Sequence, residues 1–306
     1  MSNHGKRRGL KWAARLGIPT TIAATAPLVG AQPSFAAPGT TVSYYENTTN
    51  TTTLHNQGCS AAKLAVNGTL ILQFGRPAYN GSTYGVIDYG NNFDSDAQIE
   101  TGAEAWMDGF YSCGTSSTRQ NVTIGTSNYC MDNSSCSMLP KSYSVAGSSW
   151  YGAVSTVANY VSSHNYGNKI NAIWGSVDAE PAYDAAYSGT QSFLASYNGQ
   201  SPGYAMMDDG SLESGYWTQA QEYNVAFGGF DYPFPQQYHP GMQNNWETLD
   251  LWSVSNYGHS MYFQGVTASY PYDSDITPVA GWSQMLSALQ SHSSTYQSTI
   301  PYLTNI

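Results

Sequence analysis

Charge is scarce in this sequence, and positive charge is the scarcest. Of its 306 residues, 10 are Lys or Arg and 20 are Asp or Glu, and five of the basic residues lie before residue 16. The rest of the chain therefore has no Lys/Arg cluster with which to bind a phosphate backbone. We expect no nucleic-acid partner.

Long hydrophobic runs are also absent. No segment approaches the roughly 18 consecutive apolar residues of a membrane span. The chain begins with a basic stretch (Lys6, Arg7, Arg8), a mildly apolar stretch, and the small residues Ser34 and Ala36. This pattern predicts a signal peptide over residues 1–36, for either the general or the twin-arginine export route. We expect a secreted, extracellular protein whose remaining residues carry a net charge of about −15.

Cysteine is limited to four residues, all after the predicted signal peptide. In an exported protein an even number indicates disulfides, here two, with three possible connectivities. Cys130 and Cys136 bracket the short polar loop "MDNSS", which favours a local pair and leaves Cys59 with Cys113. No His stands at a zinc-finger spacing from them, and no dinucleotide-binding or Walker motif occurs. We expect neither metal nor cofactor.

What remains is a pattern of alternating strands and helices. Residues 37–57 form a polar segment, and residues 58–306 form one domain of the usual size of a (β/α)8 barrel. Apolar runs at 69–75, 121–129 and 170–181 are typical of buried parallel strands, and further strand candidates lie at 202–210, 225–241 and 259–270. Helical stripes include Ile99, Ala103, Trp106 and Phe110. The sequence shows six or seven strand candidates and predicts an α/β fold. Its architecture is a (β/α)8 barrel or, alternatively, an open doubly wound sheet.

Barrel chemistry takes place where the strands end. The third strand ends in Asp178 and Glu180, which at positions i and i+2 face the same side, with Cβ atoms roughly 6–7 Å apart. That spacing suits two carboxyl groups flanking a glycosidic bond, one protonated and one ionised. Asp208, at the end of the fourth strand, is the alternative second carboxylate. The alternative is that the D-x-E triplet has no chemical role, because such a triplet is also common at a turn or at the start of a helix.

Other polar and aromatic residues near strand ends are candidates for binding a sugar. The chain contains 25 Tyr, whose rings suit sugar faces, although a surface poor in ionisable groups also suits acidic surroundings. The candidate substrate-binding residues are Gln73, Arg76, Asn128, Tyr129, Tyr183, Asp209, Gln237 and Tyr238.

The stretch "GSVDAE" after an apolar strand resembles the D-x-E strand end of the bacteriophage-type and fungal-type muramidases, which are barrel lysozymes. "IGTSNY", "DAEP" and the closing "FQGVT…GWSQMLSAL…YLTNI" resemble exported bacterial barrel proteins akin to glycoside hydrolases. The resemblance implies that Glu180 is the general acid and Asp178 its partner, acting on peptidoglycan or a related polysaccharide. We expect the protein to be a monomer.

One departure from the muramidase pattern leaves a second interpretation open. Those enzymes carry an Asp at the end of the first strand, where this chain reads "QFGRPAY", and Asp88 could replace it only if it also ends a strand. The alternative is a barrel that binds glycan or the cell envelope without cutting it.

Overall fold

The computed structural model describes residues 36–200, 203–228 and 232–306. Apart from Ala36, the predicted signal peptide lies outside the described residues. Within the described ranges, no helix is both long and apolar enough to cross a membrane.

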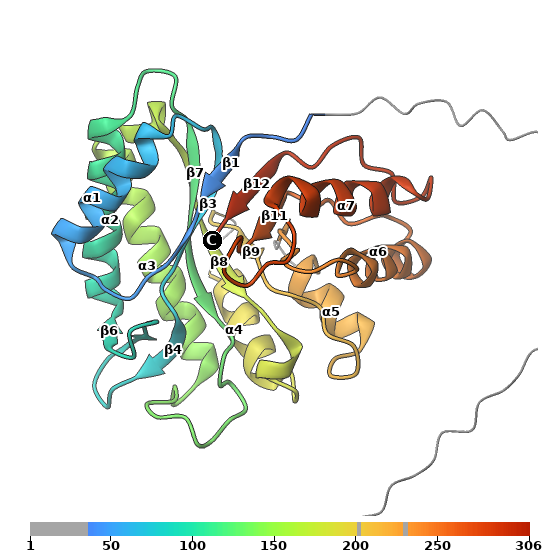
Figure 1. The fold of residues 1–306 in the computed structure, drawn as a ribbon. Helices are drawn as coiled ribbons and strands as arrows, with labels where there is room; N and C mark the ends of the chain where they lie inside the picture. Colours follow the sequence, from blue (N-terminus) through green and yellow to red (C-terminus); the bar gives the residue numbers. More distant parts are fainter. Residues whose placement is uncertain (1–35, 201–202, 229–231) are drawn as a thin grey trace, which may run out of the picture. The chain divides into compact units, whose positions relative to one another are not determined.

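Within the described residues, eight parallel strands pair into a closed barrel, which Figure 1 shows between two groups of helices. The first strand is split by Ser43, so that β1 pairs with β12 while β2 pairs with β3. On the opposite side, a bridge between Gln236 and Thr267 and a hydrogen bond from the Gln264 N–H to the Pro233 carbonyl (3.0 Å) join β10 to β11. The strands are β1 (Thr40–Val42) with β2 (Tyr44–Tyr45), β3 (Gly68–Gln73), β7 (Gln120–Ser127), β8 (Ile170–Asp178), β9 (Met206–Asp208), β10 (Tyr232–Pro233), β11 (Gly265–Ala268) and β12 (Tyr302–Asn305).

In the described part of the chain, seven α-helices connect these strands and cover the outside of the sheet. In Figure 1, α1–α4 lie on one side of the barrel and α5–α7 on the other. Two apolar clusters lie beneath them, and α5 contributes to both. The helices are α1 (Thr51–Lys63), α2 (Asp96–Cys113), α3 (Tyr143–Ser163), α4 (Ser188–Asn198), α5 (Gln219–Ala226), α6 (Gln243–Tyr257) and α7 (Pro278–Gln290). The predicted stripe from Ile99 to Phe110 is the buried face of α2, which confirms the periodicity.

The barrel confirms the predicted α/β class, and its closure excludes the open doubly wound sheet. The structure corrects the number of barrel strands from six or seven to eight, and it corrects the assignment of residues 37–57 to a segment before the barrel. That polar segment is not separate from the barrel, because it supplies the first strand and the start of α1. Its pairing with β12, at the far end of the chain, cannot be read from a local pattern.

An insertion after the β3 strand was not predicted. It is a three-stranded antiparallel sheet of β4 (Arg76–Tyr79), β5 (Tyr84–Ile87) and β6 (Phe93–Ser95). Because it leaves the barrel at the carboxyl end of β3, it lies beside the edge at which barrel proteins place their chemistry.

The interior of the barrel is polar. Residues such as Leu70, Leu72, Val122 and Ile124 belong to the outer apolar cluster, so the alternate residues of these strands face inward. The inward hydroxyls pair with one another: Ser43 with Thr304 (2.6 Å) and Thr123 with Ser176 (3.1 Å). Other inward polar side chains are Thr41, Thr69, Gln73 and Asn121.

Two disulfides confirm the expected pairing: Cys59 with Cys113, and Cys130 with Cys136. The first links α1 to the end of α2, and the second closes the loop after β7.

Removing the first disulfide should destabilise the fold more than removing the second. The sequence separations are 54 and 6 residues, and loop-closure entropy then predicts losses of about 4 and about 2 kcal/mol. We expect the double substitution Cys59→Ala/Cys113→Ala to lower the denaturation midpoint well below that of Cys130→Ala/Cys136→Ala, as followed by circular dichroism in urea. An equal effect of the two changes would contradict this ranking.

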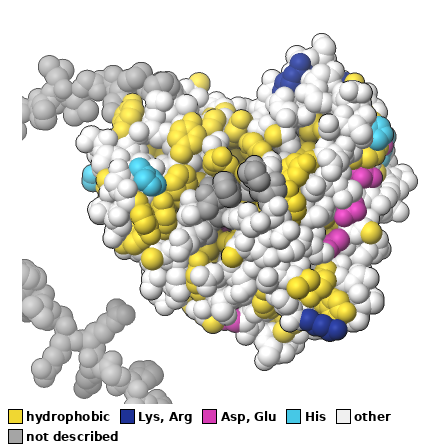
Figure 2. Space-filling model, turned by 180° about the vertical axis from the view of Figure 1, so that it is seen from behind, with side chains coloured by type: hydrophobic (Ala, Val, Ile, Leu, Met, Phe, Trp, Pro, Cys, Tyr) yellow, Lys and Arg dark blue, Asp and Glu magenta, His cyan; other side chains and the backbone are white. Residues whose placement is uncertain are grey.

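The surface carries few charges. On the face shown in Figure 2, charged side chains are few among hydrophobic and neutral ones, and several acidic side chains lie in a row along one edge. Between the described residues the only ion pairs are His239 with Asp275 and His292 with Glu247. No described carboxylate is therefore paired with a Lys or Arg.

Candidate active site

Two carboxylates lie side by side at the carboxyl edge of the barrel. Val177 pairs with Asp208, and the Asp209 N–H donates to the Val177 carbonyl (2.9 Å), so Asp178 and Asp209 occupy adjacent positions on neighbouring strands. Such strands are about 4.8 Å apart. Met206 packs in the outer cluster, so Met207 and Asp209 face inward. Register thus places Asp209, rather than Asp208, beside Asp178.

Both members of this pair are buried, Asp178 at 7% and Asp209 at 2% exposure. Burial raises the pKa of Asp178 well above its usual range, and the charges of Asp209, Glu180 and Asp208 raise it further. The pKa of Asp209 is likewise raised, by burial and then by the charge of Asp208. Two buried like charges at this separation cannot both form at neutral pH, so the pair holds a proton.

Neutral donors stabilise the negative charge that remains on the pair. The Gln236 amide donates from Nε2 to Oδ1 of Asp178 at 2.7 Å, and the Ser176 hydroxyl hydrogen-bonds Asp209. Gln236 is held in place by its bridge to Thr267 on the next strand.

Glu180 lies half-buried just beyond the pair. Burial and the charge of Glu213 raise its pKa, opposed by a hydrogen bond from the Tyr183 hydroxyl. Asn128 fixes the backbone here, because its amide donates to the Glu180 carbonyl and accepts from the Glu180 N–H, both at 2.9 Å. Asn128 is fully buried, and its amide also donates a hydrogen bond to the Thr190 hydroxyl (3.1 Å), so its side chain is fixed and holds the backbone of Glu180 in position.

Asp208 faces the backbone. Its carboxylate accepts from the N–H groups of Gly210 (3.1 Å) and Ala179, which ties the ends of β8 and β9 together. Burial nevertheless raises the pKa of Asp208 to about 7.

A cavity of about 270 Å³ opens above Asp178. Tyr89, Tyr129 and Tyr183 line it, and the rings of Tyr129 and Tyr183 meet edge to face with centroids 4.9 Å apart. Arg76 and Ser127 complete much of the wall. The cavity thus joins an acidic floor to aromatic sides.

Two tyrosines at this edge were missed in the sequence. Tyr45 ends β2, and Tyr89 follows β5 of the insertion; their ring centroids are 4.6 Å apart. The Tyr45 hydroxyl lies 3.3 Å from that of Tyr238. Burial and the charge of Asp178 raise the pKa of the Tyr45 and Tyr238 hydroxyls well above the usual range, so both remain protonated donors.

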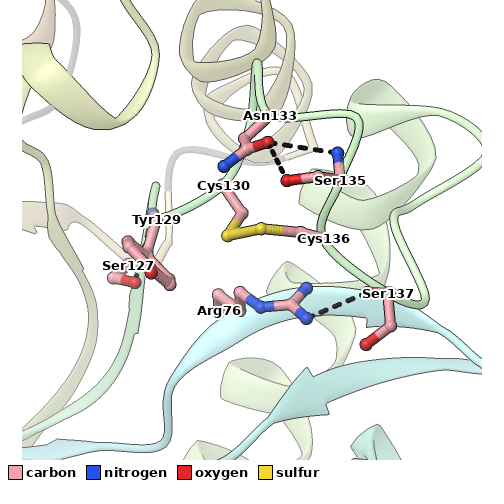
Figure 3. The surroundings of a disulfide bond; sticks show 8 residues. All are labelled: Arg76, Ser127, Tyr129, Cys130, Asn133, Ser135, Cys136 and Ser137. Carbon is pink, nitrogen blue, oxygen red and sulfur yellow. Dashed lines mark hydrogen bonds between the residues drawn. A yellow bond between two sulfur atoms is a disulfide. The ribbon is translucent and has the colours of Figure 1, made fainter.

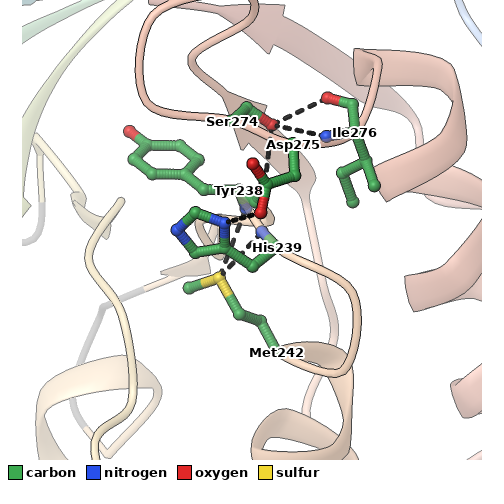
Figure 4. A network of polar contacts seen from close by, with 6 residues as sticks. All are labelled: Tyr238, His239, Met242, Ser274, Asp275 and Ile276. Atoms are coloured by element: carbon green, nitrogen blue, oxygen red, sulfur yellow. Dashed lines mark hydrogen bonds and ion pairs between the residues drawn. The ribbon is translucent and has the colours of Figure 1, made fainter.

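A polar network holds Tyr238 in place (Figure 4). The Ser274 hydroxyl donates to the Tyr238 carbonyl (2.8 Å), and the Met242 sulfur accepts from the Tyr238 N–H (3.3 Å). Beside it, His239 Nδ1 and Asp275 Oδ2 are 2.9 Å apart, which links the loops after β10 and β11.

Arg76 contributes the positive charge nearest the cavity. Its Nη2 donates to the Ser137 carbonyl (2.9 Å), and the guanidinium lies beside the Cys130–Cys136 disulfide (Figure 3). Burial lowers the pKa of Arg76. The disulfide loop thus fixes this side chain at the cavity wall.

Three further residues, Gln73, Gln237 and Asp88, occupy different positions. Gln73 is buried in the barrel, with Nε2 donating to the Thr126 carbonyl at 2.9 Å. Gln237 packs against Gly281 of α7, on the outside of the barrel, so it is not brought into the site. Asp88 follows β5 and lines the cavity, where its carboxylate accepts from the Asn92 N–H (2.6 Å).

Within the described ranges, no group of three His, Cys, Asp or Glu side chains is placed to hold a metal ion.

Comparison with known proteins gives a structural likeness alone. No family model and no curated protein matches the chain. Among solved structures, it is similar to the endoglucanase Cel5A of Pseudomonas stutzeri, at 11% identity over 78% of this chain and 73% of that one, with a TM-score of 0.39. A structure of the same endoglucanase in complex with cellobiose matches at 10% identity over 78% and 71%, also with a TM-score of 0.39.

Proposed function

We propose that this protein hydrolyses glycosidic bonds of an extracellular polysaccharide, with Glu180 as the proton donor and Asp178 as the second carboxylate. The observation that carries the proposal is the buried Asp178–Asp209 pair at the floor of a tyrosine-lined cavity, at the carboxyl edge of a parallel barrel. Carboxyl groups with raised pKa values in a cleft are the groups expected to perform acid–base catalysis.

The roles follow from the contacts. Asp178 faces the cavity and accepts from Gln236, so we assign it the negative charge and assign the proton to Asp209. Glu180, with its raised pKa, gives its proton to the leaving oxygen as the glycosidic C–O bond breaks. Asp178 supports the positive charge that develops on the sugar, and water supplies the new hydroxyl and restores the proton.

The cavity walls favour a neutral sugar. Tyrosine rings pack against the apolar faces of sugar rings while their hydroxyls bond the polar edges. Asp88 and Asp178 offset the charge of Arg76 within the same lining, and the predicted net charge of about −15 repels anionic polymers. Neutral polysaccharide, including the glycan strand of peptidoglycan, is the substrate class we propose.

Glu180→Gln should reduce the release of reducing ends by about 10²–10⁴-fold, because the side chain keeps its shape but loses its acidic proton. Activity would be assayed on peptidoglycan, chitin and cellulose. Glu213→Gln is the matched control: it removes a neighbouring carboxylate that affects the pKa of Glu180 but is given no chemical role. Full activity of the Glu180→Gln protein would refute the assignment.

A barrel that binds glycan without cutting it is the second candidate. The observation that favours it is the end of β3, where a fully buried Gln73 stands in place of the Asp found in the muramidases that the sequence resembles. Saturable binding to one of these polysaccharides with no release of reducing ends at any pH between 4 and 8 would select this candidate.

A further inference from the structure

A second groove lies at the opposite end of the barrel. It has a volume of about 320 Å³ and is formed by the loops that lead into β11 and β12. Strands begin at this end, so the groove is separated from the acid pair by the length of the barrel. Its lining residues are Ser260, Met261, Tyr262, Tyr296, Gln297, Ser298 and Thr299.

The lining combines exposed aromatic rings with unused hydroxyls and contains no charged residue. The rings of Tyr262 and Tyr296 are 50% and 53% exposed. Neither their hydroxyls nor those of Ser298 and Thr299 donate or accept a hydrogen bond within the described part of the chain. The groove therefore offers stacking surfaces and neutral donors to a ligand.

Buried polar groups hold the two loops in a fixed arrangement. Gln297 accepts from the Phe263 N–H (3.1 Å), and its Nε2 donates to the carbonyls of Phe263 (2.8 Å) and Thr299 (2.7 Å). Asp250 accepts from the Met261 N–H (2.6 Å) and the Ser260 hydroxyl (3.0 Å). A groove formed in advance loses less entropy when a ligand binds.

The end of α6, which precedes the groove in the chain, adds further aromatic surface. Tyr257, which is 50% exposed, stacks on Tyr223 with ring centroids 4.5 Å apart, and His259 follows two residues later. Flat exposed rings next to neutral hydroxyls are suited to the alternating apolar faces and hydroxyl edges of a sugar chain.

We infer that this groove, defined by Tyr262 and Tyr296, is a second binding site for neutral polysaccharide, distinct from the cavity above Asp178. Its role would be to hold the protein on an extended polymer. The inference concerns binding and does not require turnover. If the protein binds polysaccharide through Tyr262 and Tyr296 but cleaves none, this inference holds and the proposed hydrolytic function fails.

Affinity electrophoresis in native gels tests the inference, with hydroxyethyl cellulose and glycol chitin as neutral probes. We expect at least one to retard the wild-type protein, and Tyr262→Ala/Tyr296→Ala to weaken the apparent affinity by about tenfold or more. Tyr272→Ala is the matched control, because Tyr272 is an 85% exposed tyrosine that lines neither this groove nor the cavity above Asp178; it should keep most of the retardation.

The inference is overturned if neither neutral probe retards the wild type, or if the Tyr262→Ala/Tyr296→Ala protein is retarded as strongly as the wild type. It is also overturned if Tyr272→Ala weakens the retardation as much as that double substitution does. Binding of an unstructured peptide through Tyr262 and Tyr296, without binding of either polysaccharide, would assign the groove to a protein partner and would also overturn it.

Discussion

Replacing Asp178 by Asn is expected to abolish hydrolysis while making the protein more stable at pH 8. The change keeps the side-chain shape and the acceptor for Gln236 but removes the carboxylate that supports charge on the sugar. Loss of such a group costs on the order of 10³-fold or more in rate. Because burial and three neighbouring carboxylates raise the pKa of Asp178, ionising it opposes folding.

The gain in stability should appear in a thermal melt. One unit of pKa shift corresponds to about 1.4 kcal/mol, which raises the midpoint of a domain of this size by about 2–4 °C. Asp273→Asn, at an exposed aspartate, is the control and should change neither rate nor midpoint appreciably. An inactive Asp178→Asn protein that melts earlier than wild type at pH 8 would mean that Asp178 is structural.

Stability should fall as the pH rises from about 4 to 8, opposite to the usual behaviour of proteins rich in salt bridges. Burial raises the pKa of Glu46 to about 8, of Asp208 to about 7 and of Asp250 to about 6. Each group binds its proton more tightly in the folded state. The stability it contributes is therefore complete below the unfolded pKa of about 4 and is lost as the pH rises through the folded value.

Together with Asp178 and Asp209, these groups should lower the melting midpoint by on the order of 10 °C between pH 5 and pH 8. Glu46→Gln should flatten the curve near pH 8, because Glu46 is 3% exposed and its pKa is the highest of the three. Differential scanning fluorimetry across this range measures both effects. A midpoint that rises toward pH 8 would show that the carboxylates have stabilising partners outside the contacts described.

The sequence predicted those elements whose signal is local. The apolar runs became β3, β7 and β8, and the stripe of α2 became its buried face, because each element packs against one continuous apolar cluster. β1 and β12 could not be assigned to the barrel from the sequence, because each is short and they pair with one another from opposite ends of the chain. The insertion of β4–β6 interrupts the strand–helix alternation on which the prediction rested.

The candidate site was predictable only as far as strand ends could be located. Asp178 and Glu180 follow a long apolar strand, so their position was visible in the sequence. The sequence did not show which of two adjacent residues faces inward. The barrel interior is polar, so these strands lack the alternation of hydrophobic and polar residues that would mark the inward positions. Hence Gln236 and Asp209, rather than Gln237 and Asp208, lie at the acid pair, and Tyr45 and Tyr89 come from segments not assigned to the barrel.

Hydrolysis in water enriched in oxygen-18 tests the central claim most directly. Wild-type protein would be incubated at pH 5 with defined oligosaccharides of chitin, cellulose and peptidoglycan glycan, and the products analysed by mass spectrometry. We predict cleavage of at least one substrate with one oxygen-18 atom at the new reducing end, and no cleavage by the Asp178→Asn/Glu180→Gln protein. Absence of labelled product from every substrate, or equal labelling by the double variant, would contradict the account.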